Sequence, residues 1–147
     1  MAIDRVSFYQ KLRTNKLFTT LTQKQVDSID SILNECELQG VTDIRQIAYI
    51  LATPYHECYN PKFPETRITP IKEFGGEKYL KSKKYYPYFA RGYSGLTWDY
   101  NYKKEGLRLN LDLLKNPDLM LDIPTAANSH VYCMSHGSYT GKKLSDY

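Results

Sequence analysis

The sequence predicts a mainly α-helical domain with a loop-rich middle segment that leaves room for a short β-hairpin. Apolar residues recur with helical spacing from 22 to 40 and from 42 to 57, and helical signals return after residue 97. Between 60 and 95 this spacing is lost and prolines and glycines are frequent. A length of 147 residues fits one domain, so residues 1–147 are expected to fold as a single unit.

The first clear helix is expected to begin after Thr22 and to end at Gly40. Thr22 and Gln25 have the spacing of a capping box, in which each side chain accepts a hydrogen bond from the other residue's backbone. The apolar positions that follow lie on one helical face, which predicts burial: Val26, Ile29, Ile32 and Leu33.

A second helix is expected to start near Thr42 or Asp43 and to carry a broad apolar face into the core. Pro54 lies one turn before its expected end. Because proline lacks an N–H, it removes the hydrogen bond to the Ile50 carbonyl and is expected to kink the last turn. Glu57 therefore emerges where a buried helix stops.

Three further helical segments are expected in the last third of the chain, over residues 97–107, 116–120 and 124–137. Pro124 suits the first turn of the last of these, and Gly137 suits its C-terminal end. The long irregular segment between the two groups of helices is expected to be functional, because loops of that length are uncommon in compact domains.

Charge, hydropathy and cysteine content limit the classes of function that are expected for this chain. The net charge is +4, and lysines alternate with tyrosines in "KEFGGEKYLKSKKYYPYFARG", which would attract an anionic polymer such as nucleic acid or bacterial cell wall. No stretch reaches membrane-spanning length, and the N-terminal residues lack the apolar core of a signal peptide, so synthesis in the cytoplasm is expected. The odd set of three cysteines is expected to stay reduced: Cys36, Cys58 and Cys133.

The carboxylates of "HECYNPKFPETRITPIKE" suggest acid–base chemistry. A carboxyl group at the end of an apolar helix loses hydration, which favours its protonated form and suits Glu57 to the role of a general acid. A second carboxylate on a polar loop would stay ionised and activate water, a role open to Glu65 or Glu73. Such a pair is the minimum needed to hydrolyse a glycosidic bond.

Two competing chemistries lack support in the sequence. A zincin site needs a second histidine four residues after His56, and position 60 is Asn60, so no metal is expected. No serine lies in a G-x-S-x-G elbow. His130 and His136 are expected to be core or surface residues rather than ligands, and no cofactor is expected.

Several blocks resemble the chitinase-like glycoside hydrolases of family 19, in particular short phage endolysins and bacterial muralytic enzymes. They are "ATPYHE", "PIKE", "YFARGYSGLTWDYNY", "NPDLMLDIPTAA" and "MSHGSYTGKKLSDY", in the family's order, within residues 47–147. Two departures stand out, since the family's "GRG" and "QLT" are here "ARG" and "GLT". Gly95 thus removes an amide that relatives use near the substrate.

The resemblance implies a lysozyme-like fold and inverting cleavage of β-1,4-linked N-acetylated sugars. It places the general acid at Glu57 and the base at Glu73, with Glu65 as the alternative base, while the hydroxyl of Thr97 helps to place the attacking water. The residues expected to contact or support the substrate are His56, Tyr93, Trp98, Tyr100 and Asn101, with Arg91 expected to pair with Glu73.

Three functions remain open, and a fourth is considered and not expected. The leading one is a monomeric peptidoglycan hydrolase of the phage endolysin type, made without a signal peptide and acting on the cell wall after release. A chitinase is the alternative within the same chemistry, and Gly95 leaves open a catalytically impaired relative that binds glycan or protein. Nucleic-acid binding by the lysine- and tyrosine-rich stretch is not expected, because no element of the sequence reads bases.

Overall fold

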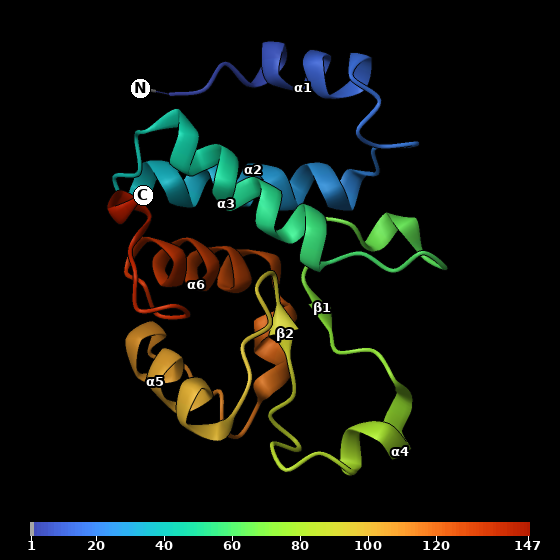
Figure 1. Cartoon of the computed structure of the whole chain (residues 1–147), viewed down its shortest axis with the longest axis vertical. Helices are drawn as coiled ribbons and strands as arrows, with labels where there is room; N and C mark the ends of the chain where they lie inside the picture. The colour runs from blue at the N-terminus through green and yellow to red at the C-terminus, as the bar shows by residue number, and fades with distance from the viewer. Residues whose placement is uncertain (1) are drawn as a thin grey trace.

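The computed structural model describes residues 2–147 and is mainly helical, as the sequence predicts (Figure 1). This architecture is consistent with a lysozyme-like helical fold. The elements, in order, are α1 (Arg5–Thr14), α2 (Gln23–Leu38), α3 (Ile44–Glu57), the 3-10 turn η1 (Pro64–Thr66), β1 (Ile71–Lys72), α4 (Gly76–Lys81), β2 (Arg91–Gly92), α5 (Asp99–Leu109), the 3-10 turn η2 (Pro117–Leu121), α6 (Ile123–Ser135) and the 3-10 turn η3 (Leu144–Asp146).

The main core lies between α2, α3 and α6. The predicted capping box at Thr22 and Gln25 is present, and the apolar face of α2 is buried as expected. Helix α1, which the sequence analysis did not predict, lies along the outer side of α2 in Figure 1. It has no buried residue, and it is attached by Arg5, whose Nη1 lies 2.8 Å from the Asp30 carboxylate, and by Tyr9, which donates to the same carboxylate. Its weak apolar periodicity explains why the sequence pattern missed it.

Helix α3 follows its N-cap Asp43 and continues through Pro54 to Glu57. The proline lies in the last turn and is buried. As expected, it leaves the Ile50 carbonyl without a helical partner, and the Nε2 of His130 on α6 lies 2.7 Å from that oxygen. A buried histidine therefore supplies the hydrogen bond that proline removes, which keeps the last turn of α3 in place.

The short sheet joins two segments that are far apart in the chain. Ile71 of β1 pairs with Gly92 of β2, and Lys72 pairs with Arg91, in antiparallel register. The strands pair as the two halves of a hairpin would, but a long connection that contains α4 separates them, instead of the tight turn of a simple hairpin. In Figure 1 this sheet lies beside the C-terminal end of α3.

A second, smaller apolar cluster holds α5 and η2 together; its buried members are Leu96, Tyr102, Leu113 and Met120. Helix α5 is fixed to α6 by Glu105, which is buried, accepts from the Ser129 hydroxyl at 2.8 Å and pairs with Arg108 at 2.7 Å. Because α5 begins directly after Thr97 and Trp98, these contacts fix the position of that part of the chain.

We expect Gly106→Ala to destabilise the protein by about 1 to 3 kcal/mol, the usual range for overpacking. A Cβ at this position would lie 2.6 Å from the Leu111 carbonyl oxygen, so the backbone after α5 must shift, which outweighs the better helix propensity of alanine. Urea unfolding followed by circular dichroism measures the change. Leu107→Ala, at an exposed position of the same helix, is the control and should stay within about 0.5 kcal/mol of the parent protein.

Candidate active site

Glu57 is the last residue of α3, and its side chain is exposed. The sequence analysis expected partial desolvation at this position, and that expectation is wrong for the unbound protein. The apolar face of α3 turns inward at Pro54 and at Cys58, which caps the helix, while His56 and Glu57 point to solvent. Desolvation of the Glu57 carboxyl would therefore require a bound ligand to cover it.

Glu73 follows β1 directly and is half-buried. Its backbone N–H donates to the Ala90 carbonyl at 2.8 Å, which extends the ladder between β1 and β2 by one residue. Its carboxylate accepts a hydrogen bond from the Tyr85 hydroxyl at 2.8 Å and another from the Ala90 N–H at 3.3 Å. Two donors thus hold this carboxylate in one orientation.

The two glutamates lie on segments that meet at β2. The Sγ of Cys58, next to Glu57, is buried and lies 3.3 Å from the Tyr93 carbonyl and 3.6 Å from the Gly92 carbonyl. Gly92 is also the partner of Ile71, two residues before Glu73. The end of α3 and the end of β1 are therefore attached to the same short strand, which places the two carboxylates on neighbouring segments.

Glu65, the alternative base, lies on η1 and is exposed. It lines a pocket of about 290 Å³ together with Tyr55, Tyr59 and Arg67. Glu73 instead lines a different pocket of about 710 Å³, which runs along β1 and the start of α4. The two candidate bases thus face different hollows, and Glu73 is the one whose carboxylate accepts hydrogen bonds from neighbouring groups.

Thr97 and Asn101 lie where the chain enters α5. The Thr97 hydroxyl donates to the Gly95 carbonyl at 2.9 Å, so its proton is occupied and its oxygen lone pairs can accept a hydrogen bond. The side-chain amide of Asn101 donates to the Thr97 carbonyl at 2.8 Å, leaving the Asn101 amide oxygen as an acceptor. Gly95 has φ +75°, a conformation that glycine adopts easily, so glycine suits this turn.

An aromatic surface lies beside these residues. The rings of Trp98 and Tyr100 are stacked with centroids 6.1 Å apart, and the two side chains are 39% and 62% exposed. Trp98 has φ +76°, which is strained for a residue with a side chain, and such strain is found mostly where function requires it. The rings of Tyr85 and Trp98 meet edge to face, with centroids 5.4 Å apart. Exposed flat rings of this kind suit the C–H face of a sugar.

Two predicted site residues belong to the core. Tyr93 is 1% exposed, so the prediction that it contacts substrate is wrong; the reason is that the turn after β2 directs its ring against α6, near His130. Arg91 is also buried and does not pair with Glu73. Its Nε lies 2.8 Å from the Asp118 carboxylate of η2, and its Nη1 donates to the Tyr102 hydroxyl at 3.1 Å.

Two residues near the site were missed from the sequence. Tyr85 contacts Glu73 directly, and Arg67 lies over the rings of Tyr55 and Tyr59, at 4.2 and 3.7 Å from the ring centroids, as a cation–π pair. The only sequence signal for Tyr85 was its place in the tyrosine-rich stretch. The sequence pattern did not single out Arg67, because an isolated arginine in a loop is ordinarily solvated.

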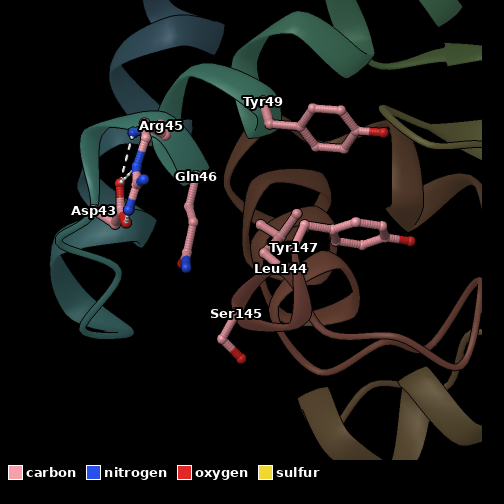
Figure 2. Close-up of a pocket in the computed structure, with 7 residues that line it drawn as sticks. All are labelled: Asp43, Arg45, Gln46, Tyr49, Leu144, Ser145 and Tyr147. Carbon is pink, nitrogen blue, oxygen red and sulfur yellow. Dashed lines mark hydrogen bonds and ion pairs between the residues drawn. The ribbon is translucent and has the colours of Figure 1, made fainter.

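A further pocket of about 420 Å³ lies at the opposite end of α3. Figure 2 shows the exposed rings of Tyr49 and Tyr147 on one side of it, with Gln46 reaching in from α3. Asp43, the N-cap of α3, also lines this pocket, and its carboxylate is paired with Arg45 at 2.6 Å. Within residues 2–147 no group of three or more acidic, histidine or cysteine side chains is placed to hold a metal ion. In the same range no helix is long and apolar enough to cross a membrane.

Comparison with known proteins gives partial matches. The chain is 33% identical to an endochitinase of Arabidopsis thaliana over 99 residues, which are 60% of this chain and 31% of that protein. The chain is similar in part to plant endochitinases. It is also 53% identical to endochitinase 1 of Theobroma cacao over 38 residues, and 50% identical to endochitinase 2 of Gossypium hirsutum over 38 residues; each match covers 26% of this chain and 12% or 13% of the relative. The match thus spans at most about a third of these relatives, and no protein-family model matches the chain.

Proposed function

We propose that the protein is a glycoside hydrolase of the family 19 type, which cleaves β-1,4 bonds between N-acetylated sugars with inversion. The observation that carries this proposal is the attachment of the Glu57 and Glu73 segments to the same strand, with Glu73 held by Tyr85 and Ala90. The partial similarity to proteins named endochitinases supports it.

In this mechanism Glu57 gives its proton to the glycosidic oxygen as the bond to the anomeric carbon breaks. Glu73 removes a proton from a water molecule, whose oxygen attacks the anomeric carbon from the opposite face. An inverting enzyme needs room for that water, which corresponds to about 6.5 to 9.5 Å between the two carboxyl groups. The oxygen of Thr97 accepts a hydrogen bond from the water and orients it.

The environment of each carboxyl group suits its role. The Glu73 carboxylate accepts hydrogen bonds from the Tyr85 hydroxyl and the Ala90 N–H, which hold it in one orientation, as a base that positions water requires. Glu57 is open to solvent in the unbound protein, and a sugar chain lying across the end of α3 would displace that water. Loss of hydration favours the protonated form, so substrate binding itself would prepare Glu57 to act as an acid.

For the substrate we propose bacterial peptidoglycan, with the protein acting as an endolysin of phage type on the cell wall after its release. The basic, tyrosine-rich stretch before β2 would hold the enzyme near an anionic wall. The names of the relatives favour chitin, which has the same backbone linkage between N-acetylated sugars. The competing function, binding of glycan or protein without catalysis, rests on Gly95. Glu73→Gln distinguishes the two functions, because this substitution would abolish the biological effect of an enzyme but not that of a binding protein.

The test is a product analysis with two substrates. Purified protein is incubated with isolated peptidoglycan and, separately, with a soluble chitin oligomer, and proton NMR follows the new reducing ends. We expect new ends of the α configuration at first, since inversion of a β bond produces the α anomer. New ends from the chitin oligomer alone would overturn the peptidoglycan assignment, an initial β anomer would overturn inversion, and no new ends from either substrate would overturn the proposed activity.

A further inference from the structure

We propose that Tyr85 is a positioning residue for the base: its hydroxyl orients the Glu73 carboxylate, and its ring ties that carboxylate to the aromatic surface on which substrate lies. This inference rests on the proposed function. Tyr85 belongs to the lysine- and tyrosine-rich stretch before β2. Its hydroxyl contacts Glu73, whereas most of the other aromatic and basic side chains of that stretch contact neither Glu57 nor Glu73.

The hydrogen bond is the first step of the argument. The Tyr85 hydroxyl donates to Oε1 of Glu73 at 2.8 Å, and the Ala90 N–H donates to Oε2 at 3.3 Å. The shorter of the two therefore comes from a side chain. This hydrogen bond, together with desolvation, raises the pKa of Tyr85 to about 12, so the phenol stays protonated and remains a donor at any pH where the protein is expected to work.

The second step is the contact between rings. The rings of Tyr85 and Trp98 pack edge to face, and Trp98 stacks on Tyr100. Trp98 directly follows Thr97, the residue proposed to orient water. One chain of contacts thus runs from the Glu73 carboxylate through Tyr85 to the exposed rings, and a sugar seated on those rings would press on the residue that holds the base.

Other charged groups surround Glu73, and the effect of Tyr85 must be separated from theirs. Lys72 precedes Glu73 in the chain, and Lys24 and Glu77 line the same pocket. Arg91 of β2 and Asp118 of η2 form an ion pair on the neighbouring segment. These groups are unchanged when the Tyr85 hydroxyl alone is removed, so a difference between the parent protein and that variant reports on the hydroxyl.

The experiment is Tyr85→Phe, which keeps the ring against Trp98 and deletes the donor. Without it the Glu73 carboxylate keeps only the longer hydrogen bond, from the Ala90 N–H, so its orientation is less fixed. We expect kcat at the optimum to fall about tenfold with KM changed less than twofold, because the base is misplaced while the sugar contacts remain. A merely structural tyrosine would lower thermal stability without changing kcat relative to KM.

Tyr88→Phe is the matched control. Its hydroxyl also donates a hydrogen bond, to the Leu114 carbonyl at 3.0 Å, and its ring also packs on a neighbouring ring, but it touches neither glutamate. This variant should keep the kcat and KM of the parent protein. Equal kcat values for the parent and Tyr85→Phe would overturn the inference, as would a Glu73→Gln variant with full activity.

A second measurement separates this inference from the proposed function. The carboxyl carbon-13 chemical shift of Glu73 is compared between the parent protein and Tyr85→Phe at pH 7 without any substrate, because it responds to the loss of a hydrogen bond to that carboxylate. We expect the chemical shift to differ between the two proteins. A difference in a protein with no glycosidase activity would reject the proposed function while confirming the contact, and an identical chemical shift would reject the positioning role.

Discussion

Glu57→Gln should lower kcat by at least about 100-fold on an unactivated sugar polymer, the lower end of the range for general acid catalysis. Glutamine has nearly the shape of glutamate but holds no proton that it can transfer to a leaving oxygen. Because the side chain is exposed at the end of α3, the substitution should leave the fold and the unfolding temperature unchanged. Reducing-end assays under single-turnover conditions measure the loss.

An activated substrate identifies the step that Glu57 serves. In a chitin oligomer with a nitrophenol leaving group, the nitrophenolate departs without protonation. Glu57→Gln should therefore retain most of its activity on that compound. Glu73→Gln should be slow on both substrates, since attack by water still needs the base. Glu65→Gln is the matched control, and its exposed carboxylate lies on η1, in a different hollow. Equal losses for Glu57→Gln on both substrates would contradict the acid role.

Acid should destabilise the protein through His130, by about 2 to 3 kcal/mol between pH 7 and pH 4.5. This histidine is buried, and its burial lowers the pKa from 6.5 to about 4. As pH falls below 6.5, His130 becomes protonated in the unfolded chain but stays neutral in the folded protein. The free energy of unfolding therefore declines until the pH reaches the pKa of His130 in the folded protein. Above pH 6.5 this contribution no longer changes. Urea unfolding at a series of pH values measures the slope.

The contacts of His130 explain why the neutral form is needed. Its Nε2 donates to the Ile50 carbonyl at 2.7 Å, and its Nδ1 accepts from the Ser94 hydroxyl, which fixes the tautomer. His130→Gln removes the titration and should flatten the decline below pH 6.5, at the cost of lower stability at pH 8. Exposed His136 provides the control, since His136→Asn should keep the parent slope. The NMR signals of His130 in the parent protein test the same point without a variant, and a titration near pH 6.5 would contradict it.

Local chemistry made several features predictable. The capping box at Thr22, the apolar face of α2 and the unpaired Ile50 carbonyl each follow from residues within a few positions of one another, so the sequence pattern contains them. The pairing of Arg91 was not predictable in this way. Its partner Asp118 lies 27 positions away on η2, and many other carboxylates were equally plausible from the sequence.

For this protein the sequence alone determined the mainly helical architecture apart from α1, the start of α2 and the candidate carboxylates, because hydrophobic periodicity and capping act over one or two turns. Only the tertiary structure decided that His130 satisfies Ile50, that Tyr85 rather than Arg91 holds Glu73, and that Tyr93 is a core residue. These choices depend on contacts across 12 to 80 positions of sequence, where burial and hydrogen bonding select one partner among many that the sequence permits.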